Sequence, residues 1–247
     1  MLLGNEAVEV LRHSHVAVFG VGGVGGYVVE VLARSGVGAI DIIDNDRISL
    51  TNINRQIIAL HSTVGRLKVD VMEERIKDIN PECTVNKFPM FYLPEDAGDL
   101  KANSDEIDLF CYDYVVDCID TVSAKIDLIR RCHELGKPLL SCMGAANKMD
   151  ATAFRVVDIS ETSMDPLAKV IRKKLRKLNI EHQKVVYSNE TPMKPAADSS
   201  MESGFFEEKP GNCRRPVPAS NAFVPAAAGL IAGGEVIKDL IGFRAEK

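Results

Sequence analysis

The sequence predicts an α/β fold in which a mostly parallel sheet carries helices on both faces. Three observations predict it. Short apolar runs alternate with helix-like segments, as expected of a sheet that is covered on both sides. A glycine-rich turn, 20–26, follows the first apolar run and opens the first helical segment. The next apolar run ends at an acidic residue, Asp44.

The first unit has the strand–turn–helix–strand order of a nucleotide-binding half. Its first strand is the apolar run 16–19. The glycine turn leads into a helix whose apolar residues recur at helical spacing. The second strand, 39–43, is followed by a polar loop rich in Asp, Asn and Arg that extends to residue 58.

The middle of the chain continues the alternation. A helix from about Gly65 stops at Asn80, because the proline that follows disfavours helix continuation. The other predicted elements here are strands at 83–88, 114–117 and 139–143, and a helix at 124–135 closed by Gly136.

The last hundred residues predict two strands, a helix, a long loop and a terminal helix. Asp165 and Pro166 start the first of these helices, as its N-cap and first-turn residue, and apolar residues follow on one face. The strands lie at 154–159 and 185–187, the loop at 188–220, and the terminal helix, rich in alanine and glycine, at 223–241.

Composition sets broad limits on the class of protein. The 247 residues are 46% hydrophobic and carry a formal net charge of -5 at pH 7. This length suits one domain, 1–247, with a sizeable core. The charge argues against a nucleic-acid coat but leaves room for a local basic patch. No apolar segment reaches the roughly 20 residues that span a bilayer, so no membrane partner is expected.

The cysteines do not have the spacing of a metal site. No two lie three positions apart, so no zinc is expected. Free thiols without a signal sequence predict a cytoplasmic location. The six residues are Cys83, Cys111, Cys118, Cys132, Cys142 and Cys213.

The glycine turn is suited to binding phosphate. Gly20, Gly22, Gly23 and Gly25 let the backbone approach a phosphate, and the start of the next helix supplies free N–H donors. Asp44 stands where an acid accepts hydrogen bonds from ribose hydroxyls. On these residues alone, a nicotinamide dehydrogenase, an ATP-using enzyme and a turn that only packs helix on strand all stay open.

The residues after Asp44 favour nucleotidyl transfer. When a carboxylate attacks the α-phosphate of ATP, negative charge builds on the phosphorus oxygens and on the departing pyrophosphate. Cations placed there stabilise the transition state more than the ground state. The loop after Asp44 and the stretch 65–68 contain arginines and a lysine, the residue types that such positions need. The stretch 117–120 at the end of the strand 114–117 carries two Asp residues, and an Asp at a strand end can hold Mg²⁺ through oxygen ligands or water.

The combination of these motifs resembles the ubiquitin-activating-enzyme-like superfamily, which includes the sulfur-carrier activators of thiamine and molybdopterin synthesis. The resemblance runs from about Leu3 to the C-terminus and implies an adenylate-forming enzyme on a Rossmann-like sheet that uses ATP and Mg²⁺. It implies catalytic roles for Arg55, Lys68 and Asp120, with Asp120 as the metal residue. The implied nucleotide-binding set is Gly20, Gly22, Gly23, Gly25, Asp44, Asp46, Asn52, Asn54, Arg55, Gln56, Lys68 and Asp120.

Later stretches, at 143–150, 157–169 and 185–188, resemble the tRNA threonylcarbamoyladenosine dehydratase family. That resemblance implies that ATP activates the threonyl carboxylate of a modified adenosine next to the anticodon. Ring closure then gives a cyclic form and releases AMP. Adenylation replaces a poor leaving group with AMP, and an internal nucleophile attacks at high effective concentration.

A strongly basic helix would then face the tRNA. If Ile171 and Leu175 point inward, six cations between positions 169 and 177 crowd the outer face, where like charges repel unless an acidic partner is near. A solvated basic face is equally open on charge alone. Residues 1–150 would bind the nucleotide, and residues 151–247 would form a tRNA-facing extension. Its predicted contacts are Lys169, Arg172, Lys173, Lys174, Arg176, Lys177, Arg214 and Arg215.

Cys213 lies beside the last two of these arginines, which would favour its thiolate. Related activators use a loop cysteine to take the acyl group, but ring closure within the substrate needs none, so a catalytic thiol and a bystander both stay open. In the family an arginine from one subunit enters its partner's active site. This implies a homodimer, with the terminal helix as interface, and a sulfur-transfer protein is a further candidate partner.

Three alternatives compete with the tRNA hypothesis. The first is an adenylyltransferase that activates the C-terminal glycine of a ubiquitin-like sulfur carrier, although such enzymes often carry zinc-binding CxxC pairs. The second is a binding module without catalysis, and the third is the dehydrogenase. ATP-dependent pyrophosphate release with either tRNA or a carrier protein would discriminate among them.

Overall fold

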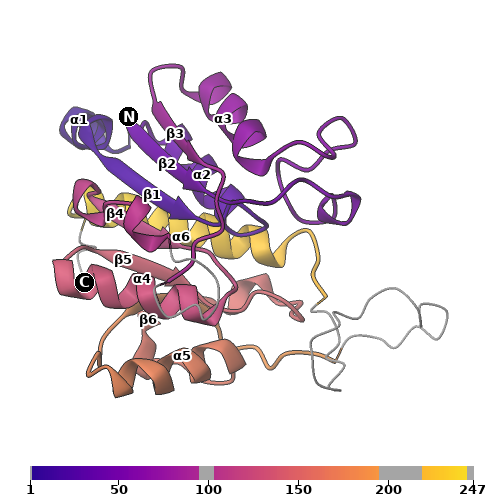
Figure 1. Cartoon of the computed structure of the whole chain (residues 1–247), viewed down its shortest axis with the longest axis vertical. Coiled ribbons are helices and arrows are strands. Elements are labelled where there is room, and N and C mark those ends of the chain that lie inside the picture. The colour runs from indigo at the N-terminus through magenta and orange to yellow at the C-terminus, as the bar shows by residue number, and fades with distance from the viewer. Residues whose placement is uncertain (1, 95–102, 195–218, 244–247) are drawn as a thin grey trace.

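A seven-stranded sheet forms the frame of the computed structural model, which describes residues 2–94, 103–194 and 219–243 (Figure 1). The strand order is β3-β2-β1-β4-β5-β7-β6. All neighbouring pairs are parallel except β6 and β7, which confirms the predicted, mostly parallel sheet. The strands are β1 (His15–Phe19), β2 (Ala39–Ile43), β3 (Thr84–Phe88), β4 (Tyr114–Asp117), β5 (Leu139–Cys142), β6 (Phe154–Asp158) and β7 (Lys184–Ser188).

Helices cover both faces of this sheet. α2, α3 and α6 share one buried apolar cluster with the sheet, and α4 and α5 share a second cluster with its opposite face. The helices are α1 (Gly4–His13), α2 (Gly25–Arg34), α3 (Lys68–Ile79), α4 (Val122–Leu135), α5 (Pro166–Lys177) and α6 (Val224–Leu240). Short 3₁₀ helices are η1 (Leu50–Asn52), η2 (Ser104–Glu106), η3 (Leu109–Cys111), η4 (Ala151–Ala153) and η5 (Ile159–Glu161).

The central strands are apolar at almost every position because both of their faces are covered. In β1, Val16 and Val18 belong to the cluster with α2 and α6, while Ala17 and Phe19 belong to the cluster with α4 and α5. Successive side chains of a strand point to opposite faces, so the continuous apolar run supplies both layers at once.

The terminal helix α6 lies directly on α2. A Cβ atom added at Gly229 would lie 2.3 Å from the carbonyl oxygen of Val24, and one added at Gly233 would lie 2.7 Å from Cβ of Val31. The small residues of α6 therefore serve close packing within the chain. A role for this helix at a subunit interface stays a prediction and concerns its other side, where Leu230 is exposed.

Two helix starts differ from the sequence-based expectation. The helix expected from about Gly65 begins at Lys68, because the preceding residues form a small antiparallel bridge, Arg47 with Leu67. Helix α1 was not predicted, although its sequence is amphipathic; only Leu11 of its residues is buried. Among the described residues, no helix has the length and apolar character needed to cross a membrane.

Candidate active site

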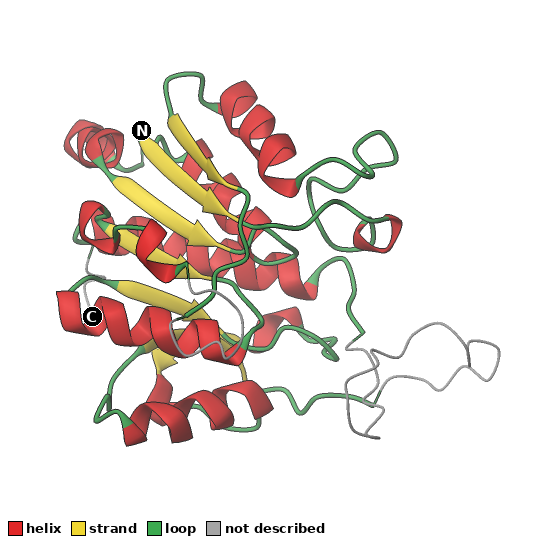
Figure 2. Cartoon of the chain, in the orientation of Figure 1, coloured by secondary structure: helices red, strands yellow, loops and turns green. Residues whose placement is uncertain are grey.

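The predicted nucleotide site lies where the direction of the sheet's connections reverses. β1 pairs with β2 on one side and with β4 on the other. At such a switch point the connections leave in opposite directions and open a crevice at the carboxyl ends of the strands. In Figure 2 the arrowheads of these strands point to one edge, where the loop after β2 projects. The motifs singled out from the sequence follow β1, β2 and β4 at this edge.

The glycine turn is pressed against the end of β4. Gly20 has a φ of 86°, and a Cβ atom there would lie 3.0 Å from the carbonyl oxygen of Cys118. A Cβ atom at Gly25 would lie 1.8 Å from the carbonyl oxygen of Gly20. Neither position accepts a side chain. The turn thereby brings the amino end of α2, where the helix dipole is positive, to the edge of the sheet.

Asp44 joins the end of β2 to the glycine turn. Its two carboxylate oxygens accept hydrogen bonds from the backbone N–H groups of Val21 and Asp46, each at 2.9 Å. Burial raises the pKa of Asp44, and the nearby Lys68 opposes this shift. A carboxylate has further lone pairs, so these two bonds leave acceptor capacity for a ligand hydroxyl.

Lys68, the first residue of α3, is nearly buried and faces two acids of the predicted site. Its ammonium lies 2.6 Å from Oδ2 of Asp46 and 3.6 Å from Oδ2 of Asp44, with 7% of its side chain exposed. Sequence reasoning placed these three residues in one site, and the structure brings them together. Asp44 and Asp46 hold the ammonium of Lys68 close to the glycine turn, because Asp44 is itself hydrogen-bonded to that turn.

Arg55 and Gln56 reach the glycine turn from the loop after β2. A Cβ atom at Gly23 would lie 3.3 Å from Cγ of Arg55, and one at Gly22 would lie 3.7 Å from Nε2 of Gln56. Gln56 is 6% exposed, and its Oε1 has no hydrogen-bond partner within the described part of the chain. A buried acceptor left unpaired beside a glycine turn fits a site that a polar ligand completes.

Two asparagines of this loop that are predicted to contact the nucleotide make hydrogen bonds within the chain. Asn52 accepts a hydrogen bond from the N–H of Ser49 at 3.1 Å and so caps η1. Asn54 uses both ends of its amide within the chain, accepting from Arg55 at 2.9 Å and donating to the carbonyl oxygen of Ser220 at 3.1 Å. The side chain of Asn54 is therefore better described as a support for Arg55.

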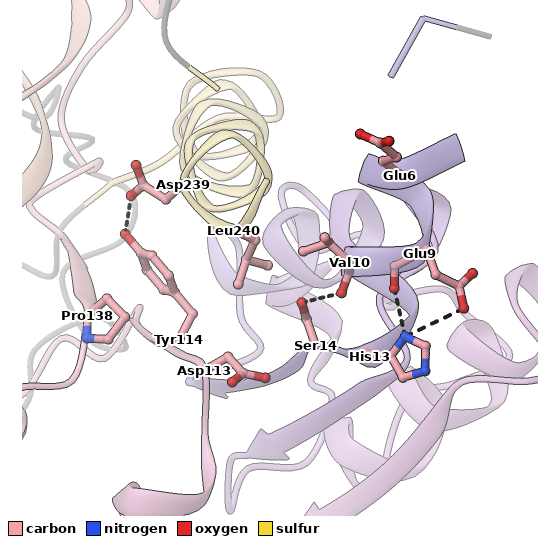
Figure 3. Close-up of a pocket in the computed structure, with 10 residues that line it drawn as sticks. All are labelled: Glu6, Glu9, Val10, His13, Ser14, Asp113, Tyr114, Pro138, Asp239 and Leu240. Atoms are coloured by element: carbon pink, nitrogen blue, oxygen red, sulfur yellow. Dashed lines mark hydrogen bonds and ion pairs between the residues drawn. The ribbon is translucent and has the colours of Figure 1, made fainter. Parts of the chain in front are cut away.

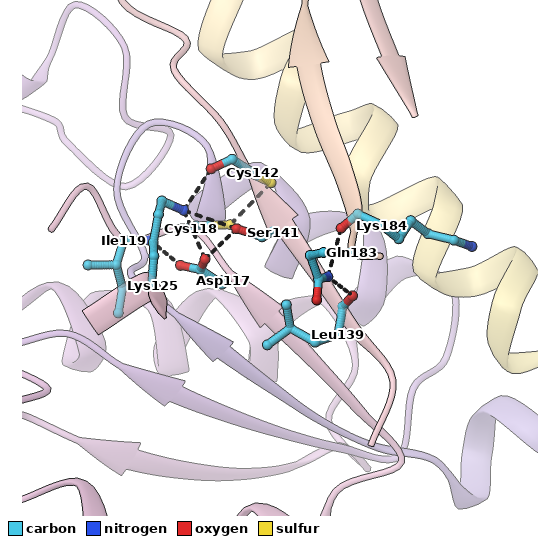
Figure 4. A network of polar contacts seen from close by, with 9 residues as sticks. All are labelled: Asp117, Cys118, Ile119, Lys125, Leu139, Ser141, Cys142, Gln183 and Lys184. Atoms are coloured by element: carbon cyan, nitrogen blue, oxygen red, sulfur yellow. Dashed lines mark hydrogen bonds and ion pairs between the residues drawn. The ribbon is translucent and has the colours of Figure 1, made fainter. Parts of the chain in front are cut away.

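Asp120, the predicted metal residue, is exposed between β4 and α4. Its neighbour Asp117 is buried and fixes the turn between them, because one carboxylate oxygen accepts from the N–H of Ile119 at 3.1 Å (Figure 4). The other oxygen accepts from Lys125 at 2.9 Å and from Ser141. This network ties β4, α4 and β5 together next to the predicted site.

Sequence reasoning did not identify Lys125 or Asp117. The available signal was the position of Lys125 on the helix, where the residues three, four and seven positions later are apolar and buried: Leu128, Ile129 and Cys132. A cation on the apolar face of a helix predicts a buried partner.

The described residues contain no group of three or more His, Cys, Asp or Glu side chains placed to hold a metal ion. Magnesium that arrives with ATP takes several of its ligands from phosphate and water, so an acid such as Asp120 need supply only one.

Cys118 and Cys142 lie side by side at the ends of β4 and β5, with their sulfur atoms 3.8 Å apart. Their mutual hydrogen bond and burial raise the pKa of the Cys118 thiol.

Helix α5 has the predicted basic face. Ile171 and Leu175 are buried, and Asp165 caps the helix by accepting from the N–H of Ala168. Arg172 departs from the prediction, because it is half-buried and donates to the carbonyl oxygen of Thr162 at 2.8 Å. The exposed cations are Lys169, Lys173, Lys174, Arg176 and Lys177. The remaining predicted residues, Cys213, Arg214 and Arg215, lie outside the described residues.

A separate cavity of about 820 Å³ lies at the opposite edge of the sheet (Figure 3). It is lined mainly by acidic and apolar side chains of α1, the start of β4 and the end of α6. None of the residues predicted to bind nucleotide or tRNA lines it. The residues predicted to bind nucleotide lie instead near the carboxyl ends of β1, β2 and β4.

A glycine turn at the switch point of a parallel sheet, with Arg55 and Lys68 close by, defines the nucleotide-binding class of α/β protein, and comparison with known proteins gives the family. All of residues 1–247 match the ThiF family, and the chain belongs to it. It is 48% identical over 242 residues to the tRNA threonylcarbamoyladenosine dehydratase of Bacillus subtilis, covering 98% of this chain and 92% of that protein.

Further relatives agree with this placement. The chain is 34% identical to the tRNA threonylcarbamoyladenosine dehydratase of Escherichia coli, covering 97% of this chain and 91% of that protein. The solved structure of the E. coli dehydratase TcdA with AMP has a TM-score of 0.83 at 32% identity, and the structure with ATP has a TM-score of 0.80. Both cover 98% of this chain and 91% of the solved chain. The E. coli protein MccB, at 20% identity and a TM-score of 0.63, shares the fold.

Proposed function

We propose that this chain uses ATP to dehydrate threonylcarbamoyladenosine in tRNA, closing it to the cyclic form through an acyl adenylate. The observation that carries the proposal is the meeting of Arg55 and Gln56 with Gly22 and Gly23 at the switch point. Similarity over nearly the whole length to dehydratases of this name, with a solved relative bound to ATP, supports the same reaction.

The bond changes of this reaction match the charges at the site. An oxygen of the threonyl carboxylate attacks the α-phosphorus of ATP, and the bond to the β-phosphate oxygen breaks, so pyrophosphate leaves. An internal nucleophile of the modified base then attacks the acyl carbon and loses its proton, and AMP leaves with the carboxylate oxygen. The net change is the loss of one water from the nucleoside, with its oxygen carried away on AMP.

The residues would divide this work by position. The glycine turn and the start of α2 receive the phosphates, and Asp44 receives the ribose hydroxyls. Arg55 and Lys68 stabilise the negative charge that grows on the phosphates in the transition state. Asp120 would hold the Mg²⁺ that arrives with ATP, and the ion would help to neutralise charge on the phosphates.

The exposed cations of α5 are proposed as contacts to tRNA phosphates, which would give affinity without sequence preference. A tRNA substrate also favours a cytoplasmic location. A homodimer, and a sulfur-transfer protein as a further partner, remain proposals that rest on family resemblance.

The alternative substrate is the C-terminal glycine of a ubiquitin-like carrier protein. The adenylyltransferase and sulfurtransferase UBA4 of Candida glabrata is 33% identical over 149 residues, but that match covers only 60% of this chain. The dehydratases of B. subtilis and E. coli match 98% and 97% of it. The longer matches to the dehydratases favour tRNA as the substrate.

Mass spectrometry of nucleosides tests the proposal. After incubation of the protein with MgATP and tRNA that carries threonylcarbamoyladenosine, we expect that nucleoside to lose the mass of one water while AMP and pyrophosphate appear. Lys68→Ala should lower the rate about 10²- to 10³-fold, since it removes a cation from the charge that develops. Lys77→Ala, on an exposed lysine of the same helix, is the matched control.

Two outcomes would reject the proposal. One is pyrophosphate release with a carrier protein ending in Gly-Gly and none with the modified tRNA. The other is an unchanged rate in a Lys68→Ala protein that melts at the temperature of the parent.

A further inference from the structure

Asn147, in the loop after β5, bridges two distant stretches of backbone. Its N–H donates to the carbonyl oxygen of Ala219 and its side-chain oxygen accepts from the N–H of Ala219, both at 2.8 Å. Its own carbonyl oxygen accepts from the N–H of Met193 at 2.7 Å. The chain at Ala219 is thus fixed by two hydrogen bonds to a single residue.

The residue after Ala219 contacts the loop that carries Arg55. The carbonyl oxygen of Ser220 accepts from the side-chain amide of Asn54 at 3.1 Å. The oxygen of the same amide accepts from Nη1 of Arg55 at 2.9 Å. The amide cannot rotate without losing both bonds, so the position of Ser220 sets the direction from which Asn54 holds the guanidinium.

The guanidinium needs such a support. An arginine side chain carries about 2 kcal/mol of rotamer entropy when free. Apart from Asn54, Nη1 donates only to the carbonyl oxygen of Thr51, at 3.2 Å, within the described part of the chain. The stem of Arg55 lies on Gly23, so a small rotation of the guanidinium changes where its charge lies relative to the glycine turn.

We infer that Asn147 is a positioning residue for Arg55, acting through Ala219, Ser220 and Asn54. Resting on the function proposed above, this assigns the C-terminal extension a direct part in adenylation, because its residues 219 and 220 complete the support of a phosphate-binding arginine. Asn147 acts on the reaction only through Arg55, which is proposed to contact the phosphates of ATP. Its replacement is therefore expected to change turnover and not the binding of tRNA.

The backbone at Asn147 makes a clean test possible. Its φ is 59°, a conformation that asparagine, aspartate and glycine adopt readily and other residues avoid. Asn147→Gly therefore keeps the backbone and removes only the side-chain bond to Ala219. Asn147→Asp keeps the accepting oxygen and serves as the conservative variant. Asn54→Asp keeps an acceptor for Arg55, turns the donor to Ser220 into a second acceptor and adds a negative charge beside the guanidinium, and so probes the second link.

Single-turnover rates with saturating MgATP and modified tRNA provide the readout. We expect Asn147→Gly and Asn54→Asp each to lower the rate about tenfold, since small misplacements of a catalytic group reduce rates by one to two orders of magnitude. The dissociation constant for tRNA should stay within twofold, and Asn147→Asp should restore most of the rate.

A double-mutant cycle separates positioning from general support. Arg55→Lys keeps a cation but lacks the planar group that Asn54 holds, so Asn147→Gly should have less than a twofold effect in that background. The same tenfold loss in both backgrounds, or parental rates for Asn147→Gly and Asn54→Asp, would overturn the inference. Parental turnover by Arg55→Ala would instead reject the proposed role of Arg55 and with it the site on which the proposed function rests.

Discussion

At the scale of single residues, the ammonium of Lys125 is a buried charge that needs partners. Its side chain is fully buried, 2.9 Å from the carboxylate of Asp117 and 2.7 Å from the carbonyl oxygen of Cys142. A charge removed from water persists only when it is paired and hydrogen-bonded. Here the pair joins the ends of β4 and β5 and holds the turn that precedes Asp120.

Lys125→Met is expected to destabilise the protein by about 3–5 kcal/mol, because it leaves the buried carboxylate of Asp117 without a cation to balance its charge. Urea unfolding followed by circular dichroism measures the loss. Replacing both members, with Lys125→Met and Asp117→Leu together, should recover part of it, since a buried ion pair often exchanges for apolar residues at little net change. A single variant as stable as the parent would show that Asp117 finds another partner.

The sequence predicted part of this residue-scale picture. Motif spacing was enough to place Arg55, Lys68 and Asp44 near the glycine turn, because all follow strands whose carboxyl ends share one edge. The bond from Asn54 to Ser220 spans 166 positions, and no local pattern indicates it. Such links depend on how loops meet after folding, which periodicity does not report.

At the scale of elements, α5 is a helix with one apolar seam and a crowded basic surface. The apolar spacing correctly predicted that Ile171 and Leu175 are inside. The direction of Arg172 could not be predicted, because its partner Thr162 belongs to the segment before the helix and lies against its side. A count of charges alone predicts that every cation of a helix is exposed to solvent. A long side chain such as that of Arg172 can instead donate hydrogen bonds to backbone carbonyl oxygens nearby.

Neutralising two of these cations, Lys173→Gln with Lys174→Gln, should weaken tRNA binding and leave ATP binding unchanged. The slope of log affinity against log salt should become shallower by about 1–2, because each phosphate that is no longer neutralised lowers it by about one. Binding titrations at several salt concentrations measure this. The control pair is Arg12→Gln with Lys77→Gln, both exposed on other helices. Equal reductions of affinity by the two pairs would mean that only net charge matters.

At the scale of the whole molecule, one sheet runs through both the nucleotide-binding part and the extension. β6 and β7 continue the sheet beyond β5, and α6 covers the strands of the nucleotide-binding part. The alternation of strands and helices was sufficient to predict this layered architecture. The strand order at β7 and β6, and the partner of α6, were not predictable, since any exposed edge or uncovered face was open to them.

Residues 1–150 alone should therefore fail to fold into an ATP-binding unit. Without α6, the apolar face formed by β1 and α2 loses its buried partners: Val224, Ala228, Ala232 and Val236. Circular dichroism and calorimetric titration with ATP, run beside the full chain, test this. A cooperative melting transition with ATP binding in residues 1–150 would show that the extension is dispensable for folding.

The packing of α6 on α2 also bears on how the chain is made. The ribosome completes α2 at Arg34 and reaches the start of α6 at Val224, about 190 residues later. At roughly 5–20 residues per second, the apolar side of α2 stays exposed for about 10–40 s before α6 has been synthesised. During that interval the nascent protein presents a surface that chaperones recognise, so slowed translation or chaperone depletion should reduce its yield far more than its stability once finished.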